Sequence, residues 1–581
     1  MIKSSIDRDI GGAAAAHGKF DAEVFDARSL SSMSLLSTGS VAGGTLDASA
    51  DPYAGTKAPN GKEIWTAEEA AENLNRNGTS WAYGNDGALD DGVLTFGFWT
   101  YEQFMDSYFG ELRYSDGSAY NDDAYYAETY GLFEAFRADQ MVAAANAIAL
   151  WDDLVNIKIE AAAPGEEADI MFGAVYMSPA AGAHAYYPQA EAINNYYGTS
   201  EYGKVSGDVM INWYYNSPNG DPNNPVLPRD ADDSFSDFTY GSYGNFAITH
   251  ELGHSLGLSH GGDYNASAGQ TITYEGNAYF YQDSQQYTIM SYFSGRKTGQ
   301  AAIDFDKLVF LYAQTPAVHD ILAVQNMYGA DHTTRAGDTV YGFNSNAGSG
   351  LYDFTQNKIP IITIWDGAGN DTLDLSGFTS NSVIDINDGA FSSAGYAATA
   401  EQRAFLKATF GYTTDAQLTS FFTRNGVKAD GSPIDNIGIA YGANIENAVG
   451  GVGNDTIKGN GLDNKLVGNG GNDTIFGGAG DDKLLGGDAN DILIGGTGND
   501  TLTGGAGADK FVFVGNDGND RITDFKSGVD KIDLTAFGID ASAVKMKGTN
   551  LFVDSDHNGS YDLHIVVQGS GVQMSDLMFH A

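Results

Sequence analysis

The chain has 581 residues, of which 42% are hydrophobic and 12% aromatic, so it can bury the cores of more than one globular domain. Its 76 acidic and 30 basic side chains give a net charge of −46, which argues against nucleic acid or an anionic membrane as a partner and indicates bound cations. Cysteine is absent, which excludes disulfides and thiolate metal sites. No apolar run reaches the roughly 18 residues of a membrane span, and the first residues lack the apolar core of a secretory leader.

The first part of the chain predicts a leader followed by helices. Residues 1–60 are rich in Ala, Gly, Ser and Asp without periodicity, which is typical of a leader or pro-segment. Thr66 and Glu69 have the spacing of a capping box, so a short helix is expected from there to Leu74. A longer helix is expected over residues 133–155, with an apolar stripe that ordinary core packing explains.

Short strand-like runs come next, and with the helices they predict an α+β domain. The runs are residues 157–160, 169–175, 183–187 and 208–214. Residues 216–237, dense in Asn, Asp and Pro, indicate a solvated loop. His184 is isolated in its run, so a structural role or a place in the lining of a substrate cleft is favoured over metal ligation.

The strongest chemical signal in the chain is a cluster of three histidines. Positions four apart on a helix share a face, so His250 and His254 can direct both imidazoles at one ion, with Glu251 beside them. Gly257 can take a left-handed conformation that ends the helix, so that the chain reverses and delivers His260 as a third ligand. Three protein ligands leave one position open for water, which is the arrangement of catalytic zinc. Chance placement is the competing explanation, but the chain has only 10 histidines.

A further helix is expected after the histidine cluster. Thr315 and Pro316 are predicted to cap it, and Gly329 is predicted to end it. His319 lies on this helix and is expected to be exposed or to stand behind a metal ligand. The first domain is therefore expected to close near residue 330.

The C-terminal half repeats with a period of nine residues over seven glycine-rich units that begin at Gly450. The eighth residue of each unit is apolar: Ile457, Leu466, Ile475, Leu484, Leu493, Leu502 and Phe511. The sixth is Asn464 in one unit and aspartate in the others: Asp455, Asp473, Asp482, Asp491, Asp500 and Asp509. A flexible glycine-rich linker would not keep the eighth position apolar in every unit.

The physical logic of this repeat is a six-residue turn followed by a three-residue strand. The glycines let carbonyl oxygens converge and the aspartates add carboxylates, so stacked turns can hold Ca²⁺, which prefers oxygen ligands. Without calcium the clustered aspartates repel, and the region after about residue 331 is expected to fold only when the ion binds. Downstream, Asp554, Asp556 and Asn558 resemble the start of an EF-hand loop, but Ile565 stands at the twelfth position, so a tight hairpin turn explains them at least as well.

Together these motifs resemble the serralysin family of metzincin zinc endopeptidases, with its RTX-type β-roll. The resemblance is carried by HELGHSLGLSHGGDYN from His250, by SYF after Met290 and by the repeats. It implies an α+β metzincin-like catalytic domain over residues 61–330, followed by a calcium-binding parallel β-roll and C-terminal secretion region over residues 331–581. Residues 394–436, which contain a helical run, interrupt the roll and have no counterpart in the family pattern.

The resemblance also implies roles for individual residues. The zinc ligands would be His250, His254, His260 and, at rest, Tyr292. Glu251 would be the general base, Tyr292 would swing to support the oxyanion, and Met290 would form the apolar floor under the metal. Calcium would be bound by the backbone of Arg335, Gly337 and Thr339 and by the side chains of Asp366, Asp371, Asp374 and Glu446. An extended substrate would bind along an edge strand made of Gly182, Ala183, His184, Ala185 and Tyr186.

The implied protein is a secreted zinc-dependent endopeptidase that acts on protein substrates and works as a monomer. A type I secretion apparatus would export it by a C-terminal signal, residues 1–60 would make it a zymogen, and a proteinaceous inhibitor is a further expected partner. Two alternatives stay open. The first is a calcium-dependent adhesin or surface-layer protein with a vestigial zinc site, and the second is a metal-dependent hydrolase of substrates other than peptides.

Overall fold

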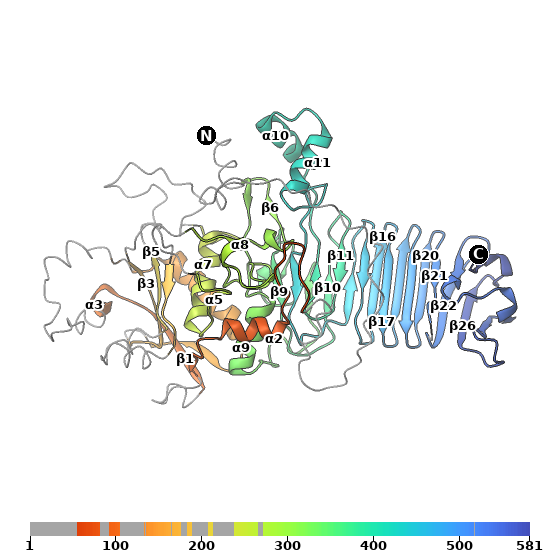
Figure 1. The fold of residues 1–581 in the computed structure, drawn as a ribbon, viewed down its shortest axis with the longest axis horizontal. Coiled ribbons are helices and arrows are strands. Elements are labelled where there is room, and N and C mark those ends of the chain that lie inside the picture. The colour runs from red at the N-terminus through yellow and green to blue at the C-terminus, as the bar shows by residue number, and fades with distance from the viewer. Residues whose placement is uncertain are drawn as a thin grey trace.

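A computed structural model of the chain describes residues 55–81, 92–104, 133, 135–163, 166–175, 183–188, 207–212, 237–264, 271–515 and 517–580. The predicted leader lies outside these ranges except for residues 55–60, and so does the predicted loop 216–237 except for Asp237. The molecule is elongated, with helices and a mixed sheet in one half and stacked strands in the other half, at whose far end the C-terminus lies (Figure 1).

The first half contains a five-stranded sheet in the order β2-β1-β3-β5-β4. Its strands are β1 (Val93–Phe98), β2 (Lys158–Ala161), β3 (Ile170–Val175), β4 (Ala183–Ala185) and β5 (Val209–Asn212). All pairings are parallel except that of β4 with β5, and β4 is an edge strand. The four predicted strand runs are therefore confirmed, while β1 was not predicted.

The helices pack beside this sheet. Those of the described first half are α2 (Ala67–Leu74), α3 (Tyr101–Phe104), α5 (Ala138–Asp152), α7 (Tyr243–Ser255), α8 (Tyr274–Asn277) and α9 (Val318–Tyr328). The predicted capping box of α2 is confirmed, since Thr66 Oγ1 accepts from the Glu69 N–H at 3.1 Å and Glu69 Oε2 accepts from the Thr66 N–H at 2.9 Å. Throughout the described residues, the structure contains no helix with the length and apolar character needed to cross a membrane.

Two predicted helix starts are wrong. The helix predicted from residue 133 begins at Ala138, because Arg137 before it is extended. The predicted cap of α9 by Thr315 and Pro316 is wrong. The Asp320 carboxylate caps the helix instead, because it accepts from the Ala317 N–H at 2.8 Å. Gly329 ends this helix as predicted, with φ of 78°.

His319 on α9 was predicted to be exposed or to stand behind a metal ligand. The prediction of exposure is wrong. The side chain is 1% exposed. Its ring lies 5.3 Å from the ring of Tyr287 and stacks 6.3 Å from that of Tyr441. Tyr441 belongs to the second half of the chain, so the helix is covered on a face that the sequence pattern leaves polar.

The second half is two facing parallel sheets. One has ten strands in the order β24-β25-β26-β22-β20-β18-β16-β14-β10-β8, and the other has seven in the order β11-β15-β17-β19-β21-β23-β27. The nine-residue repeats form β15 (Thr456–Lys458), β16 (Lys465–Gly470), β17 (Thr474–Ala479), β18 (Lys483–Asp488), β19 (Ile492–Thr497), β20 (Thr501–Ala506) and β21 (Lys510–Val512). The flanking strands are β8 (Val340–Gly342), β10 (Thr372–Asp374), β11 (Val383–Asp385), β14 (Asn447–Val449), β22 (Asn519–Phe525), β23 (Lys531–Asp533), β24 (Val544–Lys547), β25 (Asn550–Val553), β26 (Leu563–Gly569) and β27 (Leu577–Met578).

Each repeat strand pairs with the strand two units further on, as in Leu466 opposite Leu484 and Ile475 opposite Leu493. All seven eighth-position side chains are 0% exposed, so they fill the space between the sheets as predicted. At the far end the direction changes, because β24, β25 and β26 pair antiparallel. The loop with Asp554 and Asp556 connects β25 and β26 as a hairpin, but it runs from residue 554 to 562 and is not the tight turn of the prediction. Its Asp554, Asp556 and Asp562 carboxylates lie within 4.8 Å of one another, so the resemblance to a cation-binding loop stays open.

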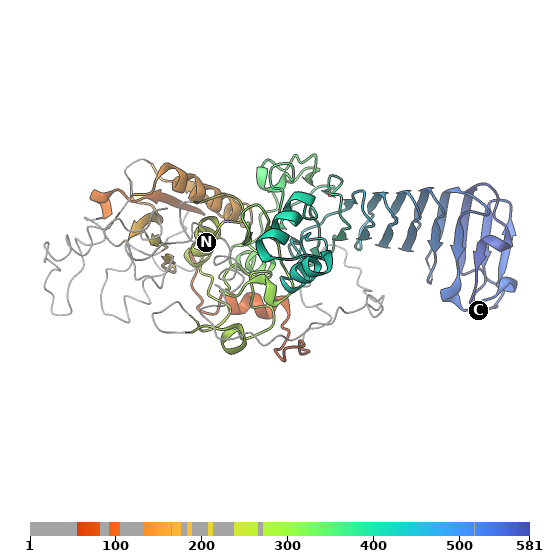
Figure 2. The ribbon, with the colours of Figure 1, turned by 90° about the horizontal axis from the view of Figure 1, so that it is seen from above.

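The predicted interruption of the roll is a pair of helices, α10 (Ala400–Phe410) and α11 (Asp415–Arg424), at the junction of the two halves (Figures 1 and 2). They share a separate hydrophobic cluster with the hairpin of β6 (Ile303–Asp304) and β7 (Val309–Phe310), in which Phe305 and Phe422 lie 5.3 Å apart. The strands before and after the two helices, β12 (Phe391–Ser392) and β13 (Ile437–Ile439), pair with each other, and β13 also pairs with β9 (Ile362–Ile364), which gives a small three-stranded sheet. The first helix was predicted, and the second was not.

Candidate metal centre

The three histidines of the predicted cluster meet at the end of α7. His250 and His254 lie one helical turn apart, with ring centroids separated by 4.9 Å. Gly257 then turns the chain at φ of 107°, and a Cβ at this position would collide with the backbone oxygen of Thr79, so only glycine fits. The turn brings His260 Nε2 to 3.1 Å from His254 Nε2. One ligand atom from each histidine lies within 4.8 Å of the others.

The histidine rings are oriented for ligation through Nε2. In each ring Nδ1 lies at hydrogen-bond distance from a backbone carbonyl, so the Nδ1–H donates and the Nε2 lone pair is left for the shared space. The acceptors are Ile289 O at 2.6 Å for His250, Leu258 O at 2.6 Å for His254 and Tyr264 O at 2.9 Å for His260. Burial lowers the pKa of His250 to about 4 and that of His254 to about 3, and it lowers the pKa of His260 well below its ordinary value. Three neutral, preoriented imidazoles fit the donor set of zinc.

Glu251 lies beside the cluster as a buried carboxyl group. It is 8% exposed, and its Oε2 has no hydrogen-bond partner among the described residues. Burial raises the pKa of Glu251 to about 8, and a backbone hydrogen bond from Ala185 partly opposes this rise. Ala185 belongs to β4, so the edge strand of the sheet runs past the carboxyl group.

The segment around Met290 packs against α7 at Gly253, between the first two histidines. Met290 is 0% exposed. It is held through Asp320 of α9, whose carboxylate accepts from Thr288 Oγ1 at 2.6 Å and from the Ile289 N–H at 2.7 Å. Because the Ile289 carbonyl accepts from His250 Nδ1, the Asp320 carboxylate also stabilises the orientation of the first histidine. Sequence reasoning missed Asp320, whose only local signal is an acidic residue in the first turn of a helix.

We expect Gly253→Ala to disrupt the packing of Met290 against α7. A Cβ at Gly253 would lie 2.5 Å from Met290 Sδ and 3.3 Å from the Trp151 ring. Helix propensity alone would favour alanine by about 1 kcal/mol, but overpacking should reverse the sign and cost about 1–3 kcal/mol. Thermal unfolding with zinc analysis checks this, and Gly571→Ala, where no atom lies within 4 Å, is the control. A variant as stable as the wild type would show that Met290 can move freely.

The remaining predicted residues of the site lie at its rim. The Tyr292 side chain is 37% exposed, and its ring lies 4.4 Å from that of His260 and 6.0 Å from that of His250. His184 is on β4 with its ring 5.1 Å from that of Tyr186, and it does not join the histidine cluster found among the described residues. Burial lowers the pKa of His184 to about 4. Gly182 lies outside the described residues.

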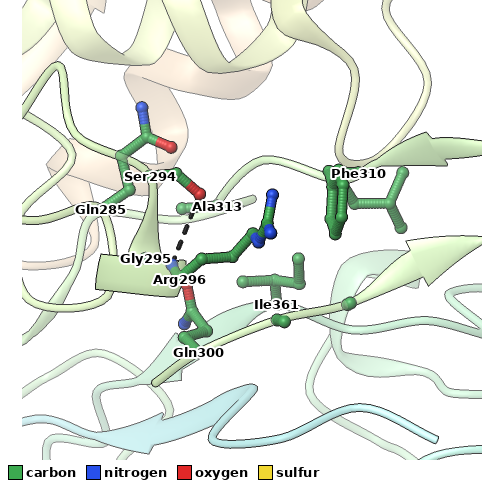
Figure 3. Close-up of a pocket in the computed structure, with 11 residues that line it drawn as sticks. Gln285, Ser294, Gly295, Arg296, Gln300, Phe310, Ala313 and Ile361 are labelled. Carbon is green, nitrogen blue, oxygen red and sulfur yellow. Dashed lines mark hydrogen bonds between the residues drawn. The ribbon is translucent and has the colours of Figure 1, made fainter. Parts of the chain in front are cut away.

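A small pocket of about 20 Å³ lies between the loop of residues 294–300, the segment of Phe310 and Ala313, and Ile361 (Figure 3). Arg296 projects into it with its guanidinium 4.4 Å from the centre of the Phe310 ring. Gln285, Ser294 and Gln300 supply the polar part of the wall. None of the predicted ligands or catalytic residues lines this pocket, so it is separate from the metal centre.

The carboxylates predicted for the first calcium site gather at the start of the roll. Asp371 Oδ1 accepts from the Thr339 N–H at 2.8 Å, while its Oδ2 is buried with no partner among the described residues. Burial, with the charges of Asp366 and Glu446 nearby, raises the pKa of Asp371 to about 7. The Gly337 carbonyl faces the same space. The unpaired Asp371 Oδ2, with the Gly337 carbonyl oxygen beside it, fits a bound cation.

Asp374 and Arg335, like Asp366 and Glu446, also have partners within the protein. Asp374 accepts from the Ser376 N–H at 2.9 Å and from Asn344 Nδ2 at 3.0 Å. The Arg335 guanidinium pairs with Asp153, at the end of α5, at 2.6 Å. Arg335 therefore connects the first turn of the roll to the first half of the molecule.

The repeat aspartates share one arrangement. In each, Oδ1 accepts from a backbone N–H of the turn two units earlier. Asp491 Oδ1 accepts from the Asp473 N–H at 2.9 Å, and Asp500 Oδ1 accepts from the Asp482 N–H at 2.9 Å. The other oxygen is buried without a partner within the described chain in Asp473, Asp482, Asp491, Asp500 and Asp520. Burial raises their pKa values to about 7, 8, 6, 6 and 8 respectively. Asp520 follows the repeats and was not predicted.

Backbone carbonyls complete these cradles. A Cβ at Gly468 would meet both Asp473 Oδ2 and the Gly486 carbonyl oxygen, and one at Gly477 would meet Asp482 Oδ2 and the Gly495 carbonyl oxygen. Oxygens of partial or full negative charge thus converge without a donor between them. This oxygen-only donor set fits Ca²⁺.

Comparison with known proteins gives matches over most of the chain. The family model for the C-terminal part of Peptidase M10 serralysin matches residues 330–400 and 425–547, and the gap between them contains nearly all of α10 and α11. The metallopeptidase AprA of Pseudomonas marginalis is 34% identical over 70% of this chain and 68% of its own length. The metalloprotease AprA of Pseudomonas entomophila (strain L48) is 36% identical over 70% of this chain and 66% of its own, and the serralysin of Proteus mirabilis is 41% identical over 70% of each. The aligned residues thus span about two thirds of these relatives.

Proposed function

The chain belongs to the serralysin family of metalloendopeptidases, and from this premise we propose that it is a secreted zinc-dependent endopeptidase with a calcium-folded roll. The observation that carries the proposal is the convergence of His250, His254 and His260 through Nε2, next to the buried and unpaired Oε2 of Glu251. An open three-histidine site with an adjacent carboxylate suits hydrolysis by an activated water.

His250, His254 and His260 would hold Zn²⁺, which supplies Lewis acidity toward a water and a substrate carbonyl oxygen. Glu251 takes up the proton of the attacking water through its unpaired Oε2, and then returns it to the leaving amine. Burial raises the pKa of Glu251, and the positive charge of a bound Zn²⁺ would oppose this rise and favour the carboxylate that accepts the proton.

Substrate recognition is assigned to the edge of the five-stranded sheet. Within the described residues β4 pairs with β5 alone, so its outer edge can take an extended peptide by main-chain hydrogen bonds. Ala183, His184 and Ala185 would line this track, and Ala185 adjoins Glu251. Tyr292, half-exposed above His260, would ligate the metal at rest and support the oxyanion during reaction. Binding through the main chain favours broad specificity.

The roll is assigned to calcium, with protein export as its purpose. We place Ca²⁺ among the unpaired oxygens of Asp371 and of the repeat aspartates. A chain that stays unfolded where calcium is scarce can pass through a type I secretion apparatus and fold outside the cell. Residues before the described part are assigned to a pro-segment, and a proteinaceous inhibitor would act at the same cleft.

Metal removal tests the proposal. The purified protein is expected to contain about one zinc ion, to lose casein hydrolysis when a zinc-selective chelator removes it, and to recover on zinc addition. The calcium-dependent circular dichroism of the roll should stay constant throughout. A zinc-loaded protein that never cleaves casein would favour the adhesin, and chelator-sensitive hydrolysis of esters without casein cleavage would favour a non-peptide hydrolase.

A further inference from the structure

Residues 62–81, which we call the N-terminal strap, lie along the loop that carries the third histidine. The strap consists of α2 and the turns around it. Leu74 O accepts from the Ser259 N–H at 2.6 Å, and Asn73 Nδ2 donates to Gly261 O at 2.8 Å. Trp81 Nε1 donates to Ser255 O at 2.8 Å. The strap thus follows the chain from the end of α7 through the loop beyond it.

Arg76 is the centre of this contact. Its Nη1 donates to the carbonyl oxygens of His260 and, at 3.1 Å, of Asn73, while Nη2 donates to Gly262 O at 3.0 Å. One planar guanidinium therefore joins the carbonyls on both sides of Gly261 to the strap. The side chain of Arg76 is 27% exposed, whereas that of its ion-pair partner Asp263, 3.4 Å away, is 76% exposed. The hydrogen bonds from Arg76 to the backbone carbonyls are therefore better shielded from solvent than its ion pair with Asp263.

The ring of His260 is fixed from the opposite side. Its Nδ1 donates to Tyr264 O at 2.9 Å, and its ring stacks on that of Tyr264 at 5.3 Å and 16°. The Tyr264 hydroxyl in turn donates to the buried Asp283 at 2.7 Å. Side-chain orientation is thus set by Tyr264, and main-chain position by Arg76. His250 and His254 differ, because the regular backbone of α7 already fixes their positions.

The strap is anchored to the body of the enzyme at its other end too. Lys62 Nζ donates to Ala278 O at 2.6 Å, and the Trp65 ring stacks on Phe280 at 4.2 Å and 8°. The Tyr281 N–H donates to Glu63 O at 2.8 Å. Both ends are therefore held, so a movement of the strap would be transmitted to the loop of the third ligand.

We propose that Arg76 is a positioning residue for the metal centre, which fixes the main chain of His260 so that the third imidazole meets the other two. This inference rests on the proposed zinc function. It makes the strap part of the metal centre, although 184 residues separate Arg76 from His260 in sequence. Processing of the N-terminus would have to stop before Lys62 for zinc to be retained.

The test is zinc affinity in the full-length, calcium-loaded protein, measured by competition with a chromophoric chelator. Loss of a supporting partner of a metal ligand typically weakens metal binding about 10–100-fold, and we expect Arg76→Ala to fall in this range. Arg76→Lys should recover part of the loss, because an ammonium is a point donor and cannot bridge two carbonyls as the fork does. Asp263→Ala is the matched control and should stay within about twofold of wild type, because its ion pair is exposed.

A second readout separates positioning from general support of the fold. At saturating zinc, Arg76→Ala should regain most of the casein activity, since Glu251 and all three histidines remain. The proposal is overturned if Arg76→Ala binds zinc as tightly as wild type. It is also overturned if the zinc-free variant unfolds at the assay temperature and Arg76→Lys, which keeps the charge, binds zinc no better. If the wild type binds zinc but cleaves no peptide, the proposed function fails while the affinity comparison still decides the role of Arg76.

Discussion

Glu251→Gln is expected to abolish casein hydrolysis and to leave the zinc content unchanged. The amide has the shape of the carboxylate but cannot take up a proton from water, and loss of such a general base typically costs about 10²–10⁴ in rate. Zinc should remain, because the Nδ1 hydrogen bonds of His250, His254 and His260 to backbone carbonyls do not involve this side chain. Initial rates on casein, paired with metal analysis of the same sample, measure both quantities.

Glu275→Gln supplies the control for this experiment. Glu275 has a 70% exposed side chain paired with Lys297 at 2.8 Å, and the same substitution there should change the rate less than twofold. A Glu251→Gln enzyme that kept zinc and worked within about tenfold of the wild-type rate would exclude Glu251 as the base. If zinc were lost with the activity, Glu251 would instead be needed for the metal centre to assemble.

Calcium removal is expected to unfold the roll at pH 8 but to leave it largely folded near pH 4. Burial raises the pKa values of Asp473, Asp482, Asp491, Asp500 and Asp520 above the ordinary aspartate value, to between about 6 and about 8. Groups of this kind bind protons more tightly in the folded state. Their contribution to stability is complete below the unfolded pKa of about 4 and is lost as the pH rises through 6 to 8.

Calcium should reverse this dependence on pH. A cation between the carboxylates favours their ionised form, so the calcium-loaded roll should be most stable near neutral pH and should release its ions on acidification. Far-UV circular dichroism from pH 4 to pH 8, with calcium or with a chelator, measures both curves. Identical curves with and without calcium would contradict the assignment of these aspartates.

Asp482→Asn gives a sharper form of the same experiment. It removes one buried charge, so it should stabilise the calcium-free roll at pH 8 and raise the calcium concentration needed for full loading. Asp463→Asn is the comparison on the same stack, because Asp463 is exposed and acts on Asp482 only through its charge, so it should change both quantities less than Asp482→Asn. Equal effects of the two substitutions would place the calcium-dependent charge at the surface rather than between the turns.

The repeats were predictable from the sequence because their information is local and periodic. Every ninth position from Ile457 to Phe511 is apolar, and each of these side chains is fully buried. Helix starts were less predictable. Thr315 and Pro316 offered a familiar capping pattern, but Asp320 satisfies the Ala317 N–H instead. His319 was misjudged because neighbours distant in sequence, including Tyr441, cover it.

The metal centre also has a part that the sequence predicts and a part that it does not. The spacing of His250, His254 and His260 stands in a single motif, as does the glycine that turns the chain between them. The groups that orient the rings come from elsewhere, such as the Ile289 carbonyl and the Arg76 guanidinium. Such pairings leave no periodic trace in one sequence, so their discovery required the structure.

The antiparallel strands β24, β25 and β26 at the C-terminal end of the roll can limit the pairing of one molecule with another. A stack of like units with an open end offers its backbone groups to the next chain, as growing fibrils do. Here the first half of the molecule lies at one end of the stack, and at the other the antiparallel pairing ends in β24, whose residues Lys545 and Lys547 are exposed. Charged lysines on a short last strand discourage the addition of another chain. Such an end favours a stack of defined length.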